Sequence, residues 1–167
     1  MASGKNSNSK GKIVGMKKLS QICATLHSRG KTIVTTNGAF DILHIGHIRY
    51  LEKAKALGDV LVVGVNSDSS VRLLKGTGRP INGQNERALI VAALGCVDYV
   101  SIFNGKLPLE FISKVKPSLH VKGGDYNSGK LPEKALVESL GGSIKIVKFE
   151  RGYSTTNIIE KIKKGKR

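Results

Sequence analysis

One stretch of the sequence, residues 35–47 (TTNGAFDILHIGH), constrains the fold more than any other. It continues the short β-branched run Ile33-Val34, which predicts a buried strand of a parallel sheet. After it, apolar residues recur at helical spacing from Ile48 to Leu57, and this pattern predicts a helix. The stretch therefore reads as a strand, a glycine-bearing turn and the start of a helix.

Two histidines lie at that helix start. His44 and His47 are three residues apart, so they project from one face of the first helical turn. A helix start offers unpaired backbone N–H groups and the positive end of the helix dipole, and both attract anions. Gly46 between the histidines leaves room for close approach. We therefore expect this turn to hold a phosphate group.

Strand and helix patterns alternate along the rest of the chain. The predicted strands are Thr32–Thr36, Val60–Asn66, Val97–Phe103, Ser118–Lys122 and Ile144–Phe149. The predicted helices are an amphipathic one ending at Gly30, then Gly46–Leu57, Ser69–Leu74, Asn85–Leu94, Leu107–Val115, Pro132–Leu140 and Thr155–Lys163. This order predicts a Rossmann-like α/β fold, with a parallel sheet that carries helices on both faces. In such sheets the ligand lies at the carboxyl ends of the strands.

The length of 167 residues predicts a single domain, which we place at residues 16–163 between basic tails at 1–15 and 164–167. The formal net charge of +16 raises the possibility of a nucleic-acid partner. Much of that charge lies in the two ends, however, and only 5% of the residues are aromatic, with no Trp. Because basic and aromatic residues do not interleave, we expect no nucleic acid as the main substrate. We expect the two basic tails to be flexible and solvated.

The remaining composition predicts a cytoplasmic protein. The two cysteines, Cys23 and Cys96, lie at apolar helix positions and form no C-x-x-C pair, so we expect ordinary thiols. No apolar run is long enough to span a membrane, and residues 1–12 lack the apolar core of a signal peptide.

The run Gly38–His47 resembles the signature of the H-x-G-H nucleotidyltransferases, in particular the cytidylyltransferase-like branch with its pattern G-T-F-D-x-x-H-x-G-H. Only Ala39 departs from that pattern. Further matches follow in the expected order at Asn66-Ser67-Asp68, Lys75, Asn85-Glu86-Arg87 and Ser154-Thr155-Thr156. Within the branch, three segments look like the bacterial D-glycero-D-manno-heptose 1-phosphate adenylyltransferases: Gly78-Arg79-Pro80, Val121–Tyr126 and Ser154–Ile159. The resemblance covers about residues 16 to 163.

The resemblance implies roles for individual residues. Those implied in catalysis are His44, His47 and Lys75. Those implied in nucleotide binding are Asn37, Gly38, Ala39, Phe40, His44, His47, Arg87, Lys122, Gly123, Asp125, Ser154, Thr155 and Thr156. Those implied in binding the second substrate are Asp68, Lys75, Arg79 and Arg87. Magnesium is expected to arrive with the nucleotide, because it bridges triphosphate oxygens, and no protein metal site is expected.

Several of these residues also have simpler interpretations. Asp41 fits a structural role, bonding backbone N–H groups of a turn. The Ser154 cluster fits helix capping, which is compatible with phosphate binding. Arg87 is less easily explained, because a cation is disfavoured at a helix start unless it meets an anion. The family pattern R-T-E-G-I-S-T-T is not kept, since Phe149 stands at its arginine and Arg151 at its glutamate.

Three alternatives stay open at this stage. A zinc site would need two further ligands beside the histidines, and no nearby Cys or His completes a set. A basic RNA- or nucleotide-binding module would use the charged tails. Among nucleotidyltransferases, the resemblance most directly implies transfer of AMP from ATP to the heptose 1-phosphate, giving ADP-heptose and pyrophosphate for lipopolysaccharide core synthesis. The alternative within this class is a CTP-dependent enzyme that acts on glycerol 3-phosphate or a similar small phosphate.

The resemblance also implies partners. They are ATP and a sugar 1-phosphate, with no membrane contact and, because relatives are often dimers, a possible homodimer. The heptose adenylyltransferases often occur fused to a sugar kinase. We expect a stand-alone version here, because 167 residues leave no room for a second catalytic domain.

Overall fold

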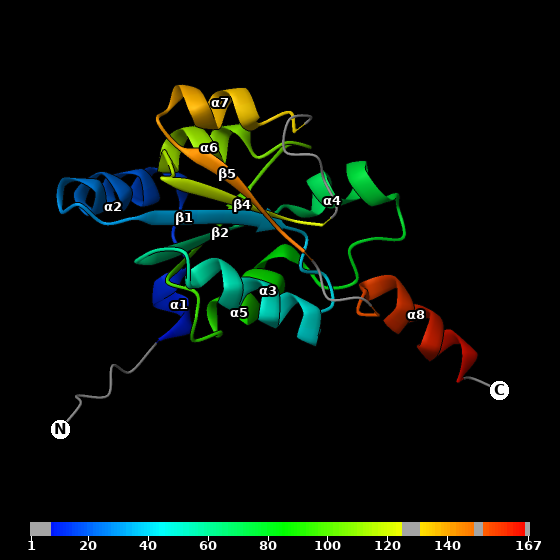
Figure 1. The fold of residues 1–167 in the computed structure, drawn as a ribbon. Helices are drawn as coiled ribbons and strands as arrows, with labels where there is room; N and C mark the ends of the chain where they lie inside the picture. Colours follow the sequence, from blue (N-terminus) through cyan, green and yellow to red (C-terminus); the bar gives the residue numbers. More distant parts are fainter. Residues whose placement is uncertain (1–7, 125–130, 149–151, 166–167) are drawn as a thin grey trace.

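The computed structural model describes residues 8–124, 131–148 and 152–165. Its centre is a parallel sheet with the strand order β3-β2-β1-β4-β5 (Figure 1). The strands are β1 (Ile33–Gly38), β2 (Val60–Asn66), β3 (Tyr99–Phe103), β4 (Leu119–Gly123) and β5 (Ser143–Val147). Strand order therefore reverses between β1 and β4, and the predicted Rossmann-like fold is confirmed.

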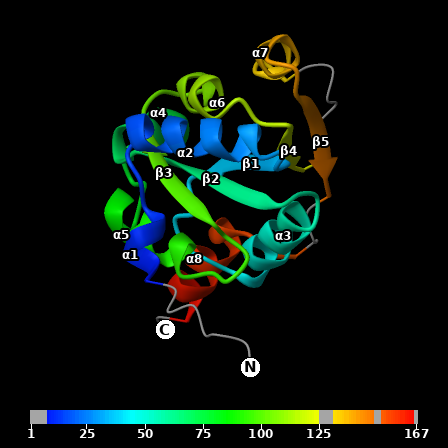
Figure 2. The ribbon, with the colours of Figure 1, turned by 90° about the vertical axis from the view of Figure 1, so that its left-hand side faces the viewer.

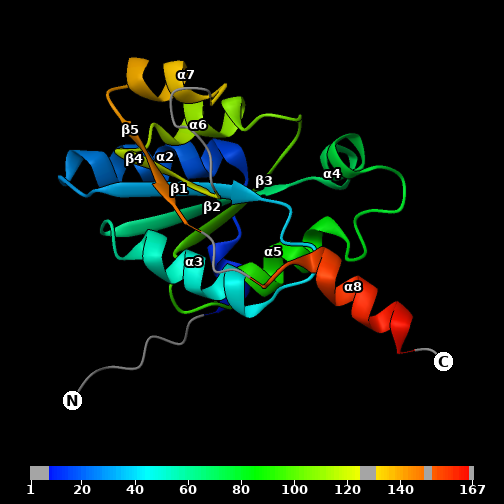
Figure 3. The same ribbon diagram turned by 45° about the vertical axis from the view of Figure 1, so that its right-hand side comes forward.

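Helices cover both faces of the sheet. They are α1 (Ser9–Lys12), α2 (Met16–Ser28), α3 (Ile45–Lys55), α4 (Asp68–Lys75), α5 (Gln84–Ala92), α6 (Leu109–Val115), α7 (Lys134–Ser139) and α8 (Thr155–Lys164). Figure 2 shows α2, α6 and α7 on one face and α1, α3, α5 and α8 on the other. At the carboxyl edge of the sheet, α4 and α8 extend beyond the strands and flank the loop that follows β1 (Figure 3).

The core consists of two apolar layers, one on each face of the sheet. Side chains alternate along β1, so the fully buried Val34 joins the layer beneath α3 and α5, while Ile33 joins the layer beneath α2 and α6. Strand β2 contributes to both layers in the same way, through Val63 and Val62. The central strands are thus buried on both sides, as their β-branched sequences predicted.

Strand β1 is longer than the sequence pattern predicted. It pairs with β2 from Ile33, opposite Val60, as far as Gly38, opposite Val65. The sequence pattern did not predict this extension, because neither Asn37 nor Gly38 favours a strand. As a result, the rigid sheet runs directly into the segment that carries the two histidines.

The N-terminal segment also differs from expectation. Residues 8–15 fall within the predicted flexible tail, but the structure packs them onto the domain. Asn8 caps the short helix α1, Ile13 forms a bridge with Val100 of β3, and Val14 is buried. The apolar pair Ile13-Val14 is the physical reason, because it covers the edge of the sheet.

Element boundaries shift by a few residues elsewhere. Helix α6 begins after Pro108 rather than at Leu107, because Pro108 takes the N-cap position. Both cysteines are free thiols, and burial raises the pKa of Cys23 to about 11. Within the described part of the chain, no helix has the length and apolar character to cross a lipid bilayer.

Candidate active site

A cavity of about 420 Å³ opens at the carboxyl edge of the sheet, beside the point where strand order reverses. One wall comes from the segment that runs from the end of β1 into the first turn of α3, which we call the histidine turn (residues 37–47), together with the end of α4 and the start of α8. The opposite wall comes from β4 and the start of α7. The lining residues are Asn37, Gly38, Ala39, Phe40, Asp41, His47, Tyr50, Lys75, Leu107, Lys122, Gly123, Leu131, Pro132, Glu133 and Thr155.

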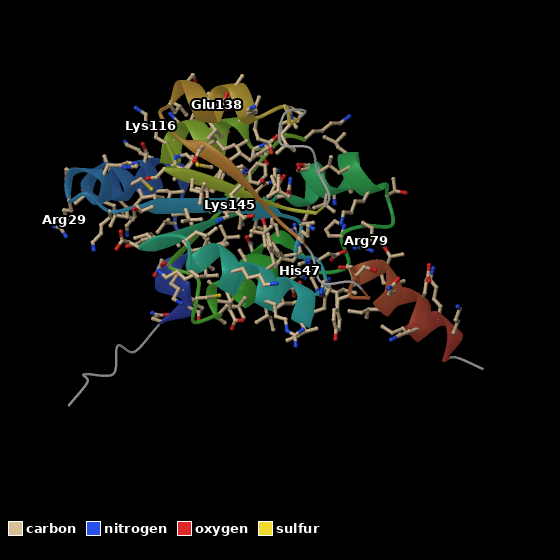
Figure 4. All side chains as sticks on the ribbon, in the orientation of Figure 1. Arg29, His47, Arg79, Lys116, Glu138 and Lys145 are labelled. Atoms are coloured by element: carbon tan, nitrogen blue, oxygen red, sulfur yellow. The ribbon has the colours of Figure 1, made fainter. Side chains whose placement is uncertain are left out.

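The two histidines form a stacked pair. Their ring centroids are 3.8 Å apart, with 22° between the ring planes, and His44 is the N-cap of α3. His47 lines the cavity, and Phe40 contacts its ring edge-on at 5.3 Å between centroids. Figure 4 shows His47 at the end of α3 that faces the carboxyl edge of the sheet. The predicted placement of both imidazoles on one helical turn is therefore found in the structure.

Electrostatics keep this pair neutral. Burial, with smaller contributions from His44 and Lys75, lowers the pKa of His47 to about 4. Burial also lowers the pKa of His44. The Nδ1 atom of each ring is buried and has no hydrogen-bond partner among the described residues. A neutral imidazole carries one N–H, on either Nδ1 or Nε2. A proton on Nε2 leaves the buried Nδ1 as an acceptor only, which avoids an unpaired buried donor. Nε2–H of His47 is then the donor available to a ligand.

Glycines allow the histidine turn to pack this tightly. A Cβ at Gly46 would stand 3.0 Å from Cβ of Tyr153 and 3.1 Å from Nδ1 of His44. A Cβ at Gly38 would stand 3.1 Å from the ring of Phe40, whose own φ of 46° lies in the left-handed region. Substitution at either glycine would thus disturb the rings that form this wall of the cavity.

Lys75, the last residue of α4, adds a positive charge beside His47. Its side chain lines the cavity, and no described residue forms a hydrogen bond or ion pair with its amino group. Partial burial and the nearby Arg79 lower the pKa of Lys75, while Asp41 acts in the opposite direction. This amino group is therefore available to an anionic ligand, as its predicted role requires.

Arg87 occupies a different environment from the one predicted for a phosphate ligand. Its side chain is fully buried, and its guanidinium donates to the backbone carbonyls of Ala39, Asn66 and Asn82. It also forms an ion pair with Asp68, at 2.8 Å between Nη2 and Oδ1. The cation at the start of α5 does meet an anion, but that anion is Asp68. In this structure Arg87 and Asp68 thus bind each other, and the binding roles implied for them stay predictions.

Arg79 is likewise engaged within the protein. Its Nε atom lies 2.5 Å from Oδ2 of the fully buried Asp41. The other Asp41 oxygen accepts hydrogen bonds from the backbone N–H groups of Ile81 and Asn82. Asp41 is therefore structural, as predicted, but the loop that it holds is residues 79–82 rather than its own turn. Arg79 lies on that loop close to α8 and does not line the cavity (Figure 4).

Lys122, at the end of β4, reaches the cavity but is not free. Its Nζ atom donates to Oδ1 of Asn37 at 2.8 Å and lies 2.7 Å from Oε1 of Glu133. Glu133 is the N-cap of α7 and is almost fully buried. Behind this pair, His120 is buried and bonds Thr35 at 2.8 Å through Nδ1. The sequence reasoning predicted Lys122 and Asn37 but missed Glu133 and His120.

The last predicted group lies at the start of α8. Ser154 caps the helix by accepting a hydrogen bond from the backbone of Asn157. Thr155 lines the cavity and donates to the carbonyl of Ile42 at 3.4 Å. Thr156 faces a separate groove that Arg79 also lines. Capping is therefore the observed role of Ser154, and Thr155 is the member of the group that reaches the cavity.

Two further predictions concern the β4 loop and metals. Gly123 lines the cavity as predicted, whereas Asp125 lies outside the described residues. Within residues 8–124, 131–148 and 152–165, no three His, Cys, Asp or Glu side chains gather in a way that would hold a metal ion. Tyr50 is a lining residue that sequence reasoning did not find. Its hydroxyl bonds Val121 and Thr36, which joins α3 to both central strands.

Fold and site together define a nucleotide-binding α/β domain of the nucleotidyltransferase class, with neutral histidines at a helix start and a lysine beside them. The sequence model of the cytidylyltransferase-like family matches residues 35–161, most of the chain. The protein therefore belongs to the cytidylyltransferase-like family and is a nucleotidyltransferase.

Individual relatives agree with this assignment. The chain is 52% identical over 158 residues to the bifunctional protein HldE of Geotalea uraniireducens, a match that covers 95% of this chain and 32% of that protein. It is 53% identical over 157 residues to HldE of Geobacter metallireducens, a match that covers 94% of this chain and 32% of that protein. The chain thus spans about a third of the length of the curated relatives that it matches.

Solved structures are similar as well. The lipopolysaccharide core biosynthesis protein from Thermoplasma volcanium is 34% identical, with a TM-score of 0.62 over 75% of this chain and 100% of that one. The pantoate-beta-alanine ligase from Francisella tularensis has a TM-score of 0.55 over 90% of this chain and 76% of that one. At 17% identity, this second likeness shows the shared fold alone.

Proposed function

We propose that this protein transfers AMP from ATP to D-glycero-D-manno-heptose 1-phosphate, giving ADP-heptose and pyrophosphate for lipopolysaccharide core synthesis. The observation that carries the proposal is the cavity that joins the stacked histidines to Lys75, whose amino group no described residue engages. The heptose acceptor is supported by the sequence resemblance, by the HldE relatives and by the likeness to the lipopolysaccharide core biosynthesis protein from Thermoplasma volcanium.

The reaction needs alignment and charge neutralisation more than proton transfer. A phosphate oxygen of the sugar phosphate, already an anion, bonds to the α-phosphorus of ATP. The bond from that phosphorus to the bridging α–β oxygen breaks, and its electrons leave with pyrophosphate. A positioned donor that meets the developing charge in such a step is worth about 10²–10³ in rate.

The residues of the cavity suit these tasks. His47 offers its Nε2–H to a triphosphate oxygen, and the stacked His44 fixes the orientation of its ring. Because the rings are neutral, they bind the phosphates through directed hydrogen bonds and do not change charge near neutral pH. Lys75 supplies the positive charge, and the histidine turn supplies backbone N–H groups at the start of α3.

Magnesium is part of the proposal as an ion that arrives with the nucleotide. The described residues build no carboxylate cage for a resident ion, and Asp41, the acid nearest the histidines in sequence, is engaged by Arg79. Triphosphate oxygens and water would therefore supply most of its ligands, and its chemistry would be to neutralise phosphate charge. We further propose that the enzyme works in the cytoplasm, where ATP is supplied.

A direct assay tests the proposal and its closest competitor. Purified protein is incubated with ATP or CTP and with heptose 1-phosphate or glycerol 3-phosphate, and pyrophosphate release is measured. We expect release with ATP and heptose 1-phosphate. The family match leaves CTP with glycerol 3-phosphate as the second candidate, and release with that pair alone would replace the proposed substrates. No release with any pair would overturn the proposed function.

A further inference from the structure

A carboxylate is an unexpected part of a cavity built for a polyanion, and Glu133 supplies one. It lines the cavity, although only 1% of the residue is exposed. Asp41, which also lines the cavity, is fully engaged by Arg79 and by the backbone of residues 81 and 82. Glu133 is ion-paired through Oε1 with Lys122, whereas no described residue donates a hydrogen bond to its Oε2. That oxygen remains an available acceptor.

The two walls of the cavity therefore differ in charge. The histidine turn, with Lys75, presents hydrogen-bond donors and a positive charge that no described residue pairs. On the opposite wall Lys122 and Glu133 cancel each other at 2.7 Å, and the apolar residues Leu131 and Pro132 stand beside them. Because α7 and α8 lie on opposite faces of the sheet, the two walls approach a ligand from two sides (Figure 3).

His120 adds no second positive charge beside Glu133. His120 lies behind it, at 3.8 Å between Nε2 and Oε1, and burial together with Lys122 lowers the pKa of His120 to about 3. This histidine is therefore neutral at physiological pH and does not add a second cation to the pair. A phosphate placed against this wall would meet no net positive charge, because the carboxylate already compensates Lys122.

We propose that Glu133 determines the orientation and identity of the nucleotide by accepting a hydrogen bond from a neutral donor of the nucleoside, a ribose hydroxyl or the exocyclic amine of the base. This inference rests on the proposed function, because it assumes that a nucleoside triphosphate occupies the cavity. Lys122 balances the carboxylate and, through Asn37, ties it to the histidine turn. The phosphates are thereby directed to His47 and Lys75.

Calorimetry with ATP and with inorganic tripolyphosphate tests whether Glu133 binds the nucleoside while His47 and Lys75 bind the phosphates. For Glu133→Gln we expect ATP affinity to fall about tenfold, the value of one hydrogen bond to a charged group, while tripolyphosphate affinity stays the same or rises. Glu138→Gln is the matched control. Glu138 lies on the same helix and also pairs with a lysine, Lys134 at 3.6 Å, but on the outer surface (Figure 4). If both variants keep the wild-type ratio of the two affinities, the inference is overturned.

A second variant covers the possibility that Glu133→Gln does not fold. In the double variant Lys122→Met/Glu133→Met the whole ion pair is replaced by side chains of similar volume, a change that folded proteins often tolerate. We expect ATP affinity to fall about tenfold here as well, with tripolyphosphate affinity close to that of the wild type. Unchanged ATP affinity in the folded double variant would contradict the inference.

Nucleotide analogues identify which hydrogen-bond donor of the nucleoside binds to Glu133. 2′-Deoxy-ATP and 3′-deoxy-ATP each lack one ribose hydroxyl, and ITP lacks the exocyclic amine. We expect the wild type to bind one analogue about tenfold more weakly than ATP, and Glu133→Gln to bind that analogue and ATP alike. Discrimination that survives in Glu133→Gln, or that is absent from the wild type, would overturn the inference. The pyrophosphate assay on the wild type separately reports whether the proposed function itself fails.

Discussion

Basic side chains at the carboxyl edge of the sheet fall into two groups, which differ in whether a carboxylate of the protein pairs with them. Arg79, Arg87 and Lys122 each pair with a carboxylate of the protein, at 2.5, 2.8 and 2.7 Å respectively. Lys75 has no such partner among the described residues. The sequence presents all four as candidate substrate ligands. The structure pairs three of them with carboxylates, whereas Lys75 lines the cavity without such a partner among the described residues.

The difference shows that charge near a site does not by itself bind substrate. A buried cation that has found its anion stabilises the loops around it and contributes little net field to the cavity. The available lysine and the neutral histidine donors act on the ligand instead. We therefore expect substitutions in the paired group to affect folding first, and substitutions of Lys75 and the histidines to affect turnover first.

The largest effect is expected for Arg87→Ala. Removing the guanidinium leaves Asp68 and three backbone carbonyls without their donor, so the free energy of unfolding should fall by about 3–5 kcal/mol. Urea denaturation measures this loss. Arg72→Ala, an exposed arginine of the neighbouring helix α4, is the control and should change stability by less than about 0.5 kcal/mol. A stable Arg87→Ala protein that no longer binds ATP would restore the phosphate role.

Next in size is the loss of rate in His47→Ala. Without its donor to the developing charge, kcat should fall by about 10²–10³, equivalent to about 2.7–4 kcal/mol. The same range is expected for His44→Ala. His27→Ala, which removes a histidine bonded to Val115 far from the cavity, should keep normal turnover. Near-normal turnover in both active-site variants, with the fold intact by circular dichroism, would refute their assignment.

A smaller effect is expected for Lys75→Ala. Loss of one charge-assisted hydrogen bond to a phosphate should lower kcat/KM by about 10- to 100-fold, while the unfolding free energy stays nearly constant because the lysine has no partner in the described part of the chain. Lys114→Ala removes an equal charge from the last turn of α6 and is the matched control. Equal kinetics in the two variants would mean that Lys75 is only a solvated surface residue.

The smallest effect is expected for the pH dependence of stability that comes from His120, which lies behind the Lys122–Glu133 pair. His120 has a folded-state pKa of about 3, whereas an unfolded histidine titrates near 6.5. Between those values the unfolded state binds more protons, so stability falls as the pH decreases, by up to about 1.4 kcal/mol per pH unit. Denaturation at pH 7, 6 and 5 should show a shallower decrease for His120→Asn than for the wild type. An identical slope would mean that His120 is not held neutral by burial.

The sequence was sufficient where local patterns decide the structure. The alternation of apolar runs predicted the order of strands and helices, and the spacing of His44 and His47 placed both rings on one turn. Boundaries were less predictable. Strand β1 continues to Gly38 because it pairs with β2, and Ile13-Val14 is ordered because it meets the edge of the sheet. Neither of these tertiary contacts leaves a local signal.

The site residues divide in the same manner. Arg87 was singled out correctly as a cation that needs an anion, but its partner Asp68 is 19 positions away in the sequence and could not be distinguished from a phosphate. Glu133 was missed for a simpler reason. An acidic residue just before a helix is already explained by the helix dipole, so the sequence gives no hint that its carboxylate reaches Lys122. Only the packing of α7 against α6 and β5 brings the two together.

The measurement that tests the account most directly is histidine side-chain NMR during titration with a non-hydrolysable ATP analogue. The chain has four histidines, and His27, which bonds Val115 away from the cavity, serves as the internal control for His44 and His47. We predict that the Nε2–H signal of His47 shifts and becomes protected from exchange when the analogue binds, and that both active-site rings stay neutral at pH 7. If the analogue binds while the signals of His44 and His47 stay unchanged, the triphosphate lies elsewhere and the account is contradicted.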